Sequence, residues 1–166
     1  MNYNLNNTCK LVKTIDQYNE DCVYFCEPIK NNIMNDGSFI RIIYSNSLFI
    51  LNGIYLNLNI NYTSVDKYYN KLKCVFDVSV HKDMLDKLFN IEDGLLKKIN
   101  INGKIPQHKI TDQLKNGLIK VFSDTSTSIS TSTSTFEKIS NIFILKIAGI
   151  WETDLEYGLT YKFINI

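Results

Sequence analysis

The sequence predicts a mainly β fold with one helix, arranged as an OB-like five-stranded barrel with an extra C-terminal strand. Several segments alternate apolar and polar residues with period two, which is typical of strands with one buried face and one wet face. One segment carries apolar residues at helical spacing instead. The helix falls between the third and fourth strands, which is the OB order. A generic α+β sheet with one helix packed on a face has the same element order, so order alone does not separate the two.

Length and composition predict one domain that spans residues 1–166. A chain of 166 residues is long enough to bury its own core. Hydrophobic residues make up 45% and charged residues 21%, as in ordinary globular proteins. Residues 1–7 have neither the basic nor the apolar part of a secretory signal, and no apolar run is long enough to span a bilayer. We therefore expect a reducing compartment in which the four cysteines are free thiols.

The first half of the chain predicts strands. Residues 10–15 and 22–26 are short apolar runs, and residues 38–44 are rich in β-branched and aromatic side chains. Residues 48–60 form the next predicted strand, which Asn52-Gly53 interrupts. That pair is either a hairpin turn or a bulge that bends a long strand. We favour the bulge, because a hairpin would leave a very short strand before it.

The middle of the chain predicts a loop, a strand and a helix. Residues 61–69 are expected to form the loop, and residues 70–80 alternate again as a strand. The helix is predicted over residues 83–99, with acidic residues in its first turn and lysines in its last, as the helix dipole favours. Its apolar stripe consists of Met84, Leu88, Ile91, Leu95 and Ile99. Residues 105–116 are polar and are expected to be irregular.

The C-terminal quarter is expected to organise the fold. After a short strand over residues 117–122, residues 123–135 are nearly all Ser and Thr, which predicts a flexible loop. Residues 141–151 then predict a buried strand, and an acidic turn leads to an alternating strand over residues 157–164. Too little chain follows the Ser/Thr tract for a second core, so the domain remains single.

Charge is uneven along the chain although the formal net charge is only +1. Residues 67–120 hold eleven Lys and six acidic residues, a net charge of +5, and the segments on either side are each net −2. A basic middle segment suits an anionic ligand. A solvated lysine-rich helix and loop would give the same count, and charge alone favours that plainer interpretation.

Two segments carry a family resemblance. Residues 144–163 contain an apolar strand that ends Gly-Ile-Trp-Glu, followed by Tyr-Gly-Leu-Thr-Tyr-Lys-Phe. This pair, together with residues 47–56, resembles small OB-fold single-stranded DNA-binding proteins of large DNA viruses, which are similar to phage-type binders. The resemblance covers about a fifth of the chain. The phage-type proteins end in an acidic tail that recruits partners, whereas this chain ends Lys-Phe-Ile-Asn-Ile, so recruitment by that route is not expected.

The resemblance implies a non-catalytic protein that binds single-stranded DNA or RNA in the host cytoplasm or a viral factory. The resemblance also implies a role in viral DNA replication. The partners would be viral replication proteins or further copies of the chain. Neither a membrane nor a cofactor is implied. Binding would use aromatic stacking on bases and Lys or Arg contacts with phosphates. The candidate residues are Arg41, Tyr44, Tyr55, Tyr68, Tyr69, Lys71, Lys73, Lys120, Lys146, Trp151 and Lys162.

The candidates also have plainer explanations. Trp151 is commonly a core or rim residue, and surface lysines often contribute nothing measurable. The alternative function is that of a viral β-barrel module that has a protein-interaction or structural role and does not bind nucleic acid. Enzymatic chemistry has the weakest basis, because Cys22 and Cys26 lack further zinc ligands at regular spacing and His81 has no evident nucleophile. We expect no metal site and interpret the cysteines as buried thiols.

Overall fold

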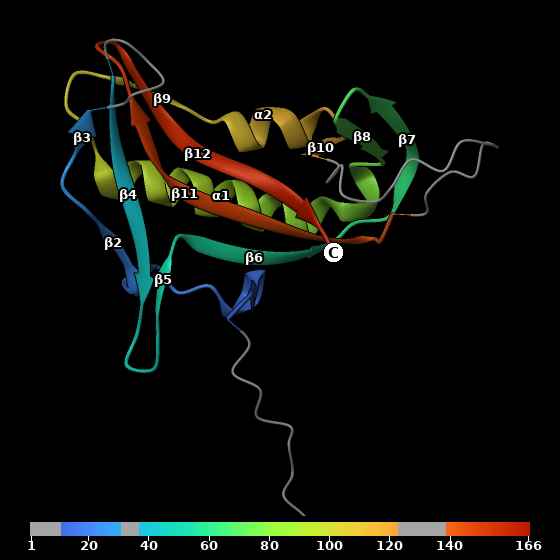
Figure 1. The fold of residues 1–166 in the computed structure, drawn as a ribbon, viewed down its shortest axis with the longest axis horizontal. Coiled ribbons are helices and arrows are strands. Elements are labelled where there is room, and N and C mark those ends of the chain that lie inside the picture. Colours follow the sequence, from blue (N-terminus) through green and yellow to red (C-terminus); the bar gives the residue numbers. More distant parts are fainter. Residues whose placement is uncertain (1–10, 31–36, 123–138) are drawn as a thin grey trace, which may run out of the picture.

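The computed structural model describes residues 11–30, 37–122 and 139–166 (Figure 1). The predicted Ser/Thr loop at 123–135 lies outside these residues. The strands are β1 (Lys13–Thr14), β2 (Val23–Phe25), β3 (Ile29–Lys30), β4 (Ser38–Ser45), β5 (Ile50–Asn52), β6 (Ile54–Asn59), β7 (Tyr62–Tyr68), β8 (Lys71–Phe76), β9 (Ile105–Gln107), β10 (Leu118–Phe122), β11 (Ile142–Glu152) and β12 (Glu156–Asn165). The helices are α1 (Lys82–Ile99) and α2 (Lys109–Lys115), with 3-10 turns η1 (Ile15–Gln17), η2 (Glu20–Cys22) and η3 (Ser79–His81).

The strands form one mixed sheet that is not closed. Its main path runs β1-β6-β11-β12-β10-β8-β7, so β1 and β7 stand at opposite ends. The remaining described strands attach through β4, which pairs with β11, and through β9, which pairs with β12. The prediction of a mainly β fold with one long helix is confirmed. The OB-like barrel is not confirmed, because a barrel requires a closed sheet.

The β11–β12 pair lies at the centre of this sheet, as its sequence predicts. β11 pairs with β12 along one edge and, in turn, with β6 and β4 along the other. The register shifts between Ile147 and Gly149, which marks a β-bulge. The partner strand changes at the same place, because β6 pairs with residues 142–147 and β4 with residues 149–152. The bulge therefore divides β11 into two halves with different neighbours.

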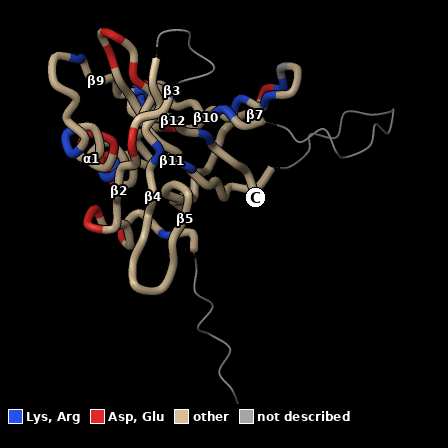
Figure 2. The backbone as a smooth tube through the Cα atoms, turned by 60° about the vertical axis from the view of Figure 1, so that its left-hand side comes forward, with Lys and Arg blue, Asp and Glu red and all other residues tan. Residues whose placement is uncertain are grey.

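The interruption at Asn52-Gly53 is a bend between two strands, as the bulge prediction requires. β5 pairs with β4 and β6 pairs with β11, so β5 and β6 are not the two arms of one hairpin. Gly53 has a φ of +104°, and a Cβ there would lie 2.6 Å from the carbonyl oxygen of Ile147. Only glycine meets both requirements without strain. The β4–β5 hairpin projects from the body of the molecule in both Figure 1 and Figure 2.

Helices α1 and α2 pack on one face of the sheet and form the core with it. Three of the five predicted stripe residues are buried, and Met84 and Ile99 are half-buried. Leu85 and Leu96 are also buried and widen the apolar face. The helix ends at Asn100, whose left-handed φ of 39° stops the helical repeat. In the described part of the chain, no helix is long and apolar enough to cross a membrane.

Two predicted irregular segments are in fact regular. The expected loop over residues 61–69 is mostly the edge strand β7, which its pairing with β8 stabilises despite a polar sequence. Residues 105–116, also expected to be irregular, contain β9 and α2. In contrast, the strand predicted over residues 70–80 ends at Phe76, since Asp77 then accepts hydrogen bonds from the backbone and hydroxyl of Ser79 in a tight turn.

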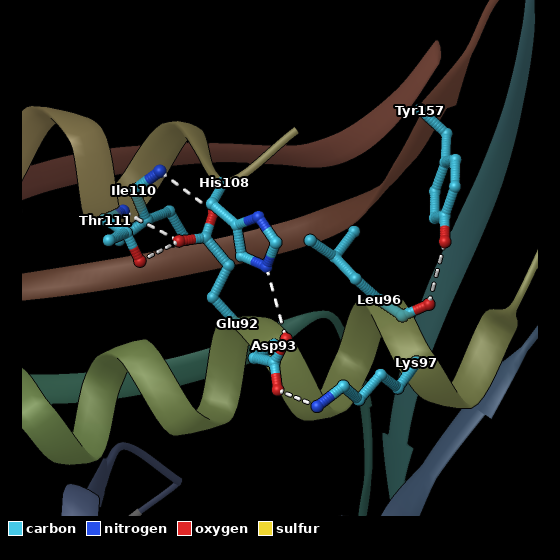
Figure 3. A network of polar contacts seen from close by, with 8 residues as sticks. All are labelled: Glu92, Asp93, Leu96, Lys97, His108, Ile110, Thr111 and Tyr157. Atoms are coloured by element: carbon cyan, nitrogen blue, oxygen red, sulfur yellow. Dashed lines mark hydrogen bonds and ion pairs between the residues drawn. The ribbon is translucent and has the colours of Figure 1, made fainter. Parts of the chain in front are cut away.

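Helix α2 begins on a buried carboxylate (Figure 3). Glu92 of α1 is fully buried and accepts hydrogen bonds from the backbone N–H groups of Ile110 and Thr111, at 2.9 and 2.7 Å. The Thr111 hydroxyl donates a third bond to it, at 2.6 Å. A negative charge at a helix N-terminus is favourable and satisfies N–H groups that have no intrahelical partner. This long-range cap explains a short helix that local sequence does not predict.

Candidate nucleic-acid interface

The face of the sheet opposite α1 and α2 is the candidate interface, and it is called the open face below. Alternation along β12 separates the two faces. Tyr157, Leu159 and Phe163 are buried towards the helices. Tyr161 points the same way, since its hydroxyl donates to the carbonyl oxygen of Lys109 on α2 at 3.1 Å. Lys162 lies between these residues in sequence and is exposed, so its side chain lies on the open face.

Strand register brings four lysines into one row across the open face. Lys146 on β11 is paired with Lys162 on β12, and Lys120 on β10 is paired with Lys73 on β8. The pairing of Val121 with Phe163 in parallel strands sets Lys120 beside Lys162. The lysine row is therefore Lys146, Lys162, Lys120 and Lys73. At about 4.8 Å between neighbouring strands it spans about 14 Å.

Aromatic rings flank the lysine row on the same face. Tyr55 on β6 is the cross-strand partner of Lys146, whose Nζ lies 5.1 Å from the centre of the tyrosine ring. Phe122 follows Val121 at the end of β10 and is 60% exposed. The Nζ of Lys71 lies 5.2 Å from the centre of the Phe122 ring. Tyr55 with Lys146 and Phe122 with Lys71 thus each combine an aromatic ring with an ammonium group, the two groups that bind bases and phosphates.

The row concentrates positive charge on the open face. Among the described residues, none of its four lysines forms an ion pair. One carboxylate approaches the row, since Asp66 on β7 is the cross-strand partner of Lys73. Like charges directly opposite each other destabilise a sheet. The arrangement therefore opposes folding slightly, and a bound polyanion would relieve the repulsion.

Charge is distributed differently on the rest of the molecule. Figure 2 shows many of the red Asp and Glu positions around α1 and the loops near β9. The basic segment 67–120 does not form one face, because its lysines divide between the open face and the helices on the other side of the sheet. Lys146 and Lys162 lie outside that segment. The local charge of the open face thus comes from register rather than from a run of basic sequence.

The structure places eight of the eleven candidates on the open face, within, beside or beyond the row. Tyr55 and Lys71 flank it, and the row itself contributes four. Trp151 lies beyond the bulge of β11 and is half-buried. Arg41 on β4 is exposed and is the cross-strand partner of Gly149, so it lies on the same face. This adds an eighth candidate at the far end of the sheet.

The remaining three candidates lie elsewhere or cannot be placed. Tyr44 does not lie on the open face. It is buried, only 3% exposed, its hydroxyl accepts from the backbone of Asn19 at 3.0 Å, and burial raises the pKa of that hydroxyl. Tyr69 lies at the β7–β8 turn with a φ of 52°, outside both strands. Tyr68 belongs to β7, and its side chain lies outside the described residues.

The His and Cys side chains of the described residues form no metal site. No group of three or more His, Cys, Asp or Glu side chains among them could hold a metal ion. The Nε2 of His81 accepts a hydrogen bond from the backbone of Asn61 at 3.1 Å, which gives the ring a structural role. Cys74 is buried, and this raises the pKa of its thiol to about 11. Cys26 is exposed, so the buried-thiol interpretation is wrong for this residue.

Sequence reasoning missed Phe122 and the row itself. Alternation in β10 was enough to place Phe122 beside Lys120 on the wet side of its strand. The row could not be predicted without the pairing of β10 with β12, which joins distant segments in parallel and has no local sequence signal.

No family model matches this chain, and neither a curated protein nor a solved structure matches it.

Proposed function

We propose that this protein is a non-catalytic binding protein for single-stranded nucleic acid, and that the open face is its binding surface. The observation that carries the proposal is the lysine row, which presents four ammonium groups in line across four neighbouring strands, none of them in an ion pair with another described residue. Phosphates of one strand would lie along this row. Tyr55, beyond Lys146 at one end of the row, and Phe122, two residues after Lys120 on β10, would stack against bases.

A single strand fits this surface better than a duplex does. Stacking on Tyr55 or Phe122 requires unpaired bases, whereas duplex recognition uses an element that enters a groove. Both described α-helices pack on the opposite face of the sheet, so neither enters a groove from this one. Viral origin and a part in replication stay predictions. The proposed contacts require only an open sheet face.

Charge-removing variants test the proposal. Lys120→Gln with Lys162→Gln removes the two central members of the row, and both side chains are exposed, so the fold is expected to tolerate the change. The slope of log affinity against log salt should become shallower by about 1.4, since each phosphate contact contributes about 0.7 for single strands. Fluorescence polarisation with a labelled oligo-dT measures this slope.

The matched control is Lys82→Gln with Lys109→Gln. These lysines are exposed and belong to α1 and α2, on the other side of the sheet. The net charge changes equally in the two double variants, so any difference reports position rather than total charge. Equal weakening by both double variants would contradict the proposed surface, as would no effect of the row variant.

Binding to a protein is the second candidate function, and one observation favours it. The β4–β5 hairpin projects from the molecule, and its turn presents Leu48 and Ile50, which are 80% and 74% exposed. Neighbouring exposed apolar side chains on a protruding element are typical of protein contacts.

Under this alternative, Leu48→Ser with Ile50→Ser would abolish self-association or partner binding in sedimentation experiments. The lysine-row variants would leave that association unchanged.

A further inference from the structure

A second cluster of side chains lies on the open face, beyond the bulge of β11. Phe39 on β4 is the cross-strand partner of Trp151 on β11, and Trp151 is in turn the partner of Gly158 on β12. On its other side, Phe39 is paired with Ile29 on β3, whose side chain is exposed. Ile29, Phe39 and Trp151 therefore form one apolar row across three neighbouring strands, parallel to the lysine row.

Both aromatic rings rest on glycine. A Cβ on Gly158 would lie 2.8 Å from Cζ2 and 2.9 Å from Cε2 of Trp151. A Cβ on Gly149 would lie 2.5 Å from Cζ of Phe39. The rings thus occupy the space that side chains at these positions would fill, and they cover the sheet backbone. Both residues are half-buried, so each ring packs on the sheet and keeps part of its surface exposed.

We infer that Phe39 and Trp151 form a stacking platform for bases of the single strand whose phosphates contact the lysine row. This inference rests on the proposed function. A ring held against the sheet loses little conformational freedom when a base stacks on it, so its stacking energy is retained. Phe39 is thereby assigned a binding role that the sequence does not indicate.

The position of the platform relative to the lysine row suits one nucleotide chain. Gly158, under the Trp151 ring, precedes Lys162 by four residues on β12, which is about 13 Å at 3.3 Å per residue. Thr160 lies between them on the open face. A long lysine side chain and a nucleotide together bridge such a distance, so phosphates on the row can place bases towards the platform.

Charge near the platform is compatible with a polyanion. Arg41 is exposed, and its partner Gly149 lies next to the platform on β11. Glu152 follows Trp151, but alternation directs its carboxylate to the helix side, where it pairs with Lys104 at 2.5 Å and accepts from the Ser38 hydroxyl at 2.6 Å. The neighbouring carboxylate is therefore neutralised within the protein and turned away from the open face.

Tryptophan fluorescence tests the inference directly, because Trp151 is the only tryptophan in the chain. Titration with unlabelled oligo-dT should quench this emission and protect the indole from acrylamide, with the same midpoint that polarisation of a labelled oligo-dT gives. Polarisation that reports binding while the tryptophan emission and its acrylamide quenching stay unchanged would overturn the platform and leave the proposed function standing. Absence of binding by polarisation would overturn the proposed function, and the platform with it.

A pair of variants extends the test to Phe39. Phe39→Leu should weaken oligo-dT binding by about 5- to 150-fold, the range that loss of one base–aromatic stack produces. Phe89→Leu is the control, because Phe89 is also half-buried but belongs to α1 on the other side of the sheet. Thermal unfolding of both variants shows whether each is folded at the assay temperature. Equal affinity of the folded Phe39→Leu and Phe89→Leu proteins would overturn the role of Phe39.

Discussion

Lys162 shows how the role of a single residue depends on its distant neighbours. Sequence alternation alone was enough to place this lysine on the wet side of its strand, between Tyr161 and Phe163. Its importance arises from the lysines beside it on β11 and β10, which come from other parts of the chain. Tyr44 shows the opposite case. Its sequence neighbours resemble those of an exposed strand residue, but the side chain is buried and its ring stacks with those of Tyr18 and Phe49.

Glu92 is the residue whose loss should cost most stability outside the apolar core. Glu92→Ala would leave the N–H groups of Ile110 and Thr111 buried without an acceptor and remove three hydrogen bonds. We expect the free energy of unfolding to fall by about 2–4 kcal/mol. Urea unfolding measures this. Asp86→Ala on the exposed side of α1 is the control, and an equally small change in both variants would disprove the capping role.

Glu152 predicts a dependence of stability on pH. Hydrogen bonds from Lys104, and secondarily from Ser38, lower the pKa of this carboxyl below its ordinary value of 4.5. Folding therefore favours the ionised form, and this contribution is present above pH 4.5 and lost as pH falls through the lower pKa of the folded state.

The corresponding experiment compares urea unfolding of Glu152→Gln with the parent protein at pH 7 and pH 3. The variant should be less stable at pH 7, and the difference should shrink at pH 3. Asp154→Asn is the control, because Asp154 is two residues further along the chain and its side chain is exposed. A difference that stays constant between the two pH values would rule out the ionised carboxylate as the stabilising group.

At the scale of elements, local pattern predicts best where an element is amphipathic and long. The limits of α1 differ from the predicted 83–99 by a single residue, because its apolar stripe and terminal charges are all local signals. Local pattern also predicts four of the strands, which the sequence places at residues 38–44, 117–122, 141–151 and 157–164. β7 and α2 are not predicted, since a neighbouring strand stabilises the first and a carboxylate eighteen residues upstream of Ile110 caps the second.

Helix α1 contains one position where a better helix former should fit. Gly94 lies in its interior with an ordinary φ, and a Cβ there would meet only the Glu20 side chain, at 3.7 Å, an ordinary contact distance. Gly94→Ala should therefore raise the free energy of unfolding by about 0.5–1 kcal/mol. Thermal or urea unfolding measures this.

Gly117→Ala provides the contrasting variant. Gly117 has a φ of +64°, and its Cβ would lie 2.6 Å from the carbonyl oxygen of Phe76. This substitution should destabilise the protein. If Gly94→Ala and Gly117→Ala changed the free energy of unfolding in the same direction, the helix and the turn would not differ in the way described.

At the scale of the whole molecule, topology creates the candidate site. Five strands that are scattered between residues 54 and 165 meet side by side, and alternation turns their lysines and flanking aromatic residues to the face without helices. The sequence contains every one of these side chains, and most were recognisable as wet-face residues. Their assembly was not, because strand order in a mixed sheet depends on long-range pairing rather than on local pattern.

The central claim is that the open face binds single-stranded nucleic acid through the lysine row. Fluorescence polarisation of a labelled oligo-dT, at low and moderate salt and with duplex DNA as the control, tests it most directly. The account predicts binding that prefers the single strand and weakens with salt with a slope of about −3 on logarithmic axes, from four lysines at about 0.7 each. No binding at low salt, or equal affinity for the duplex, would contradict it.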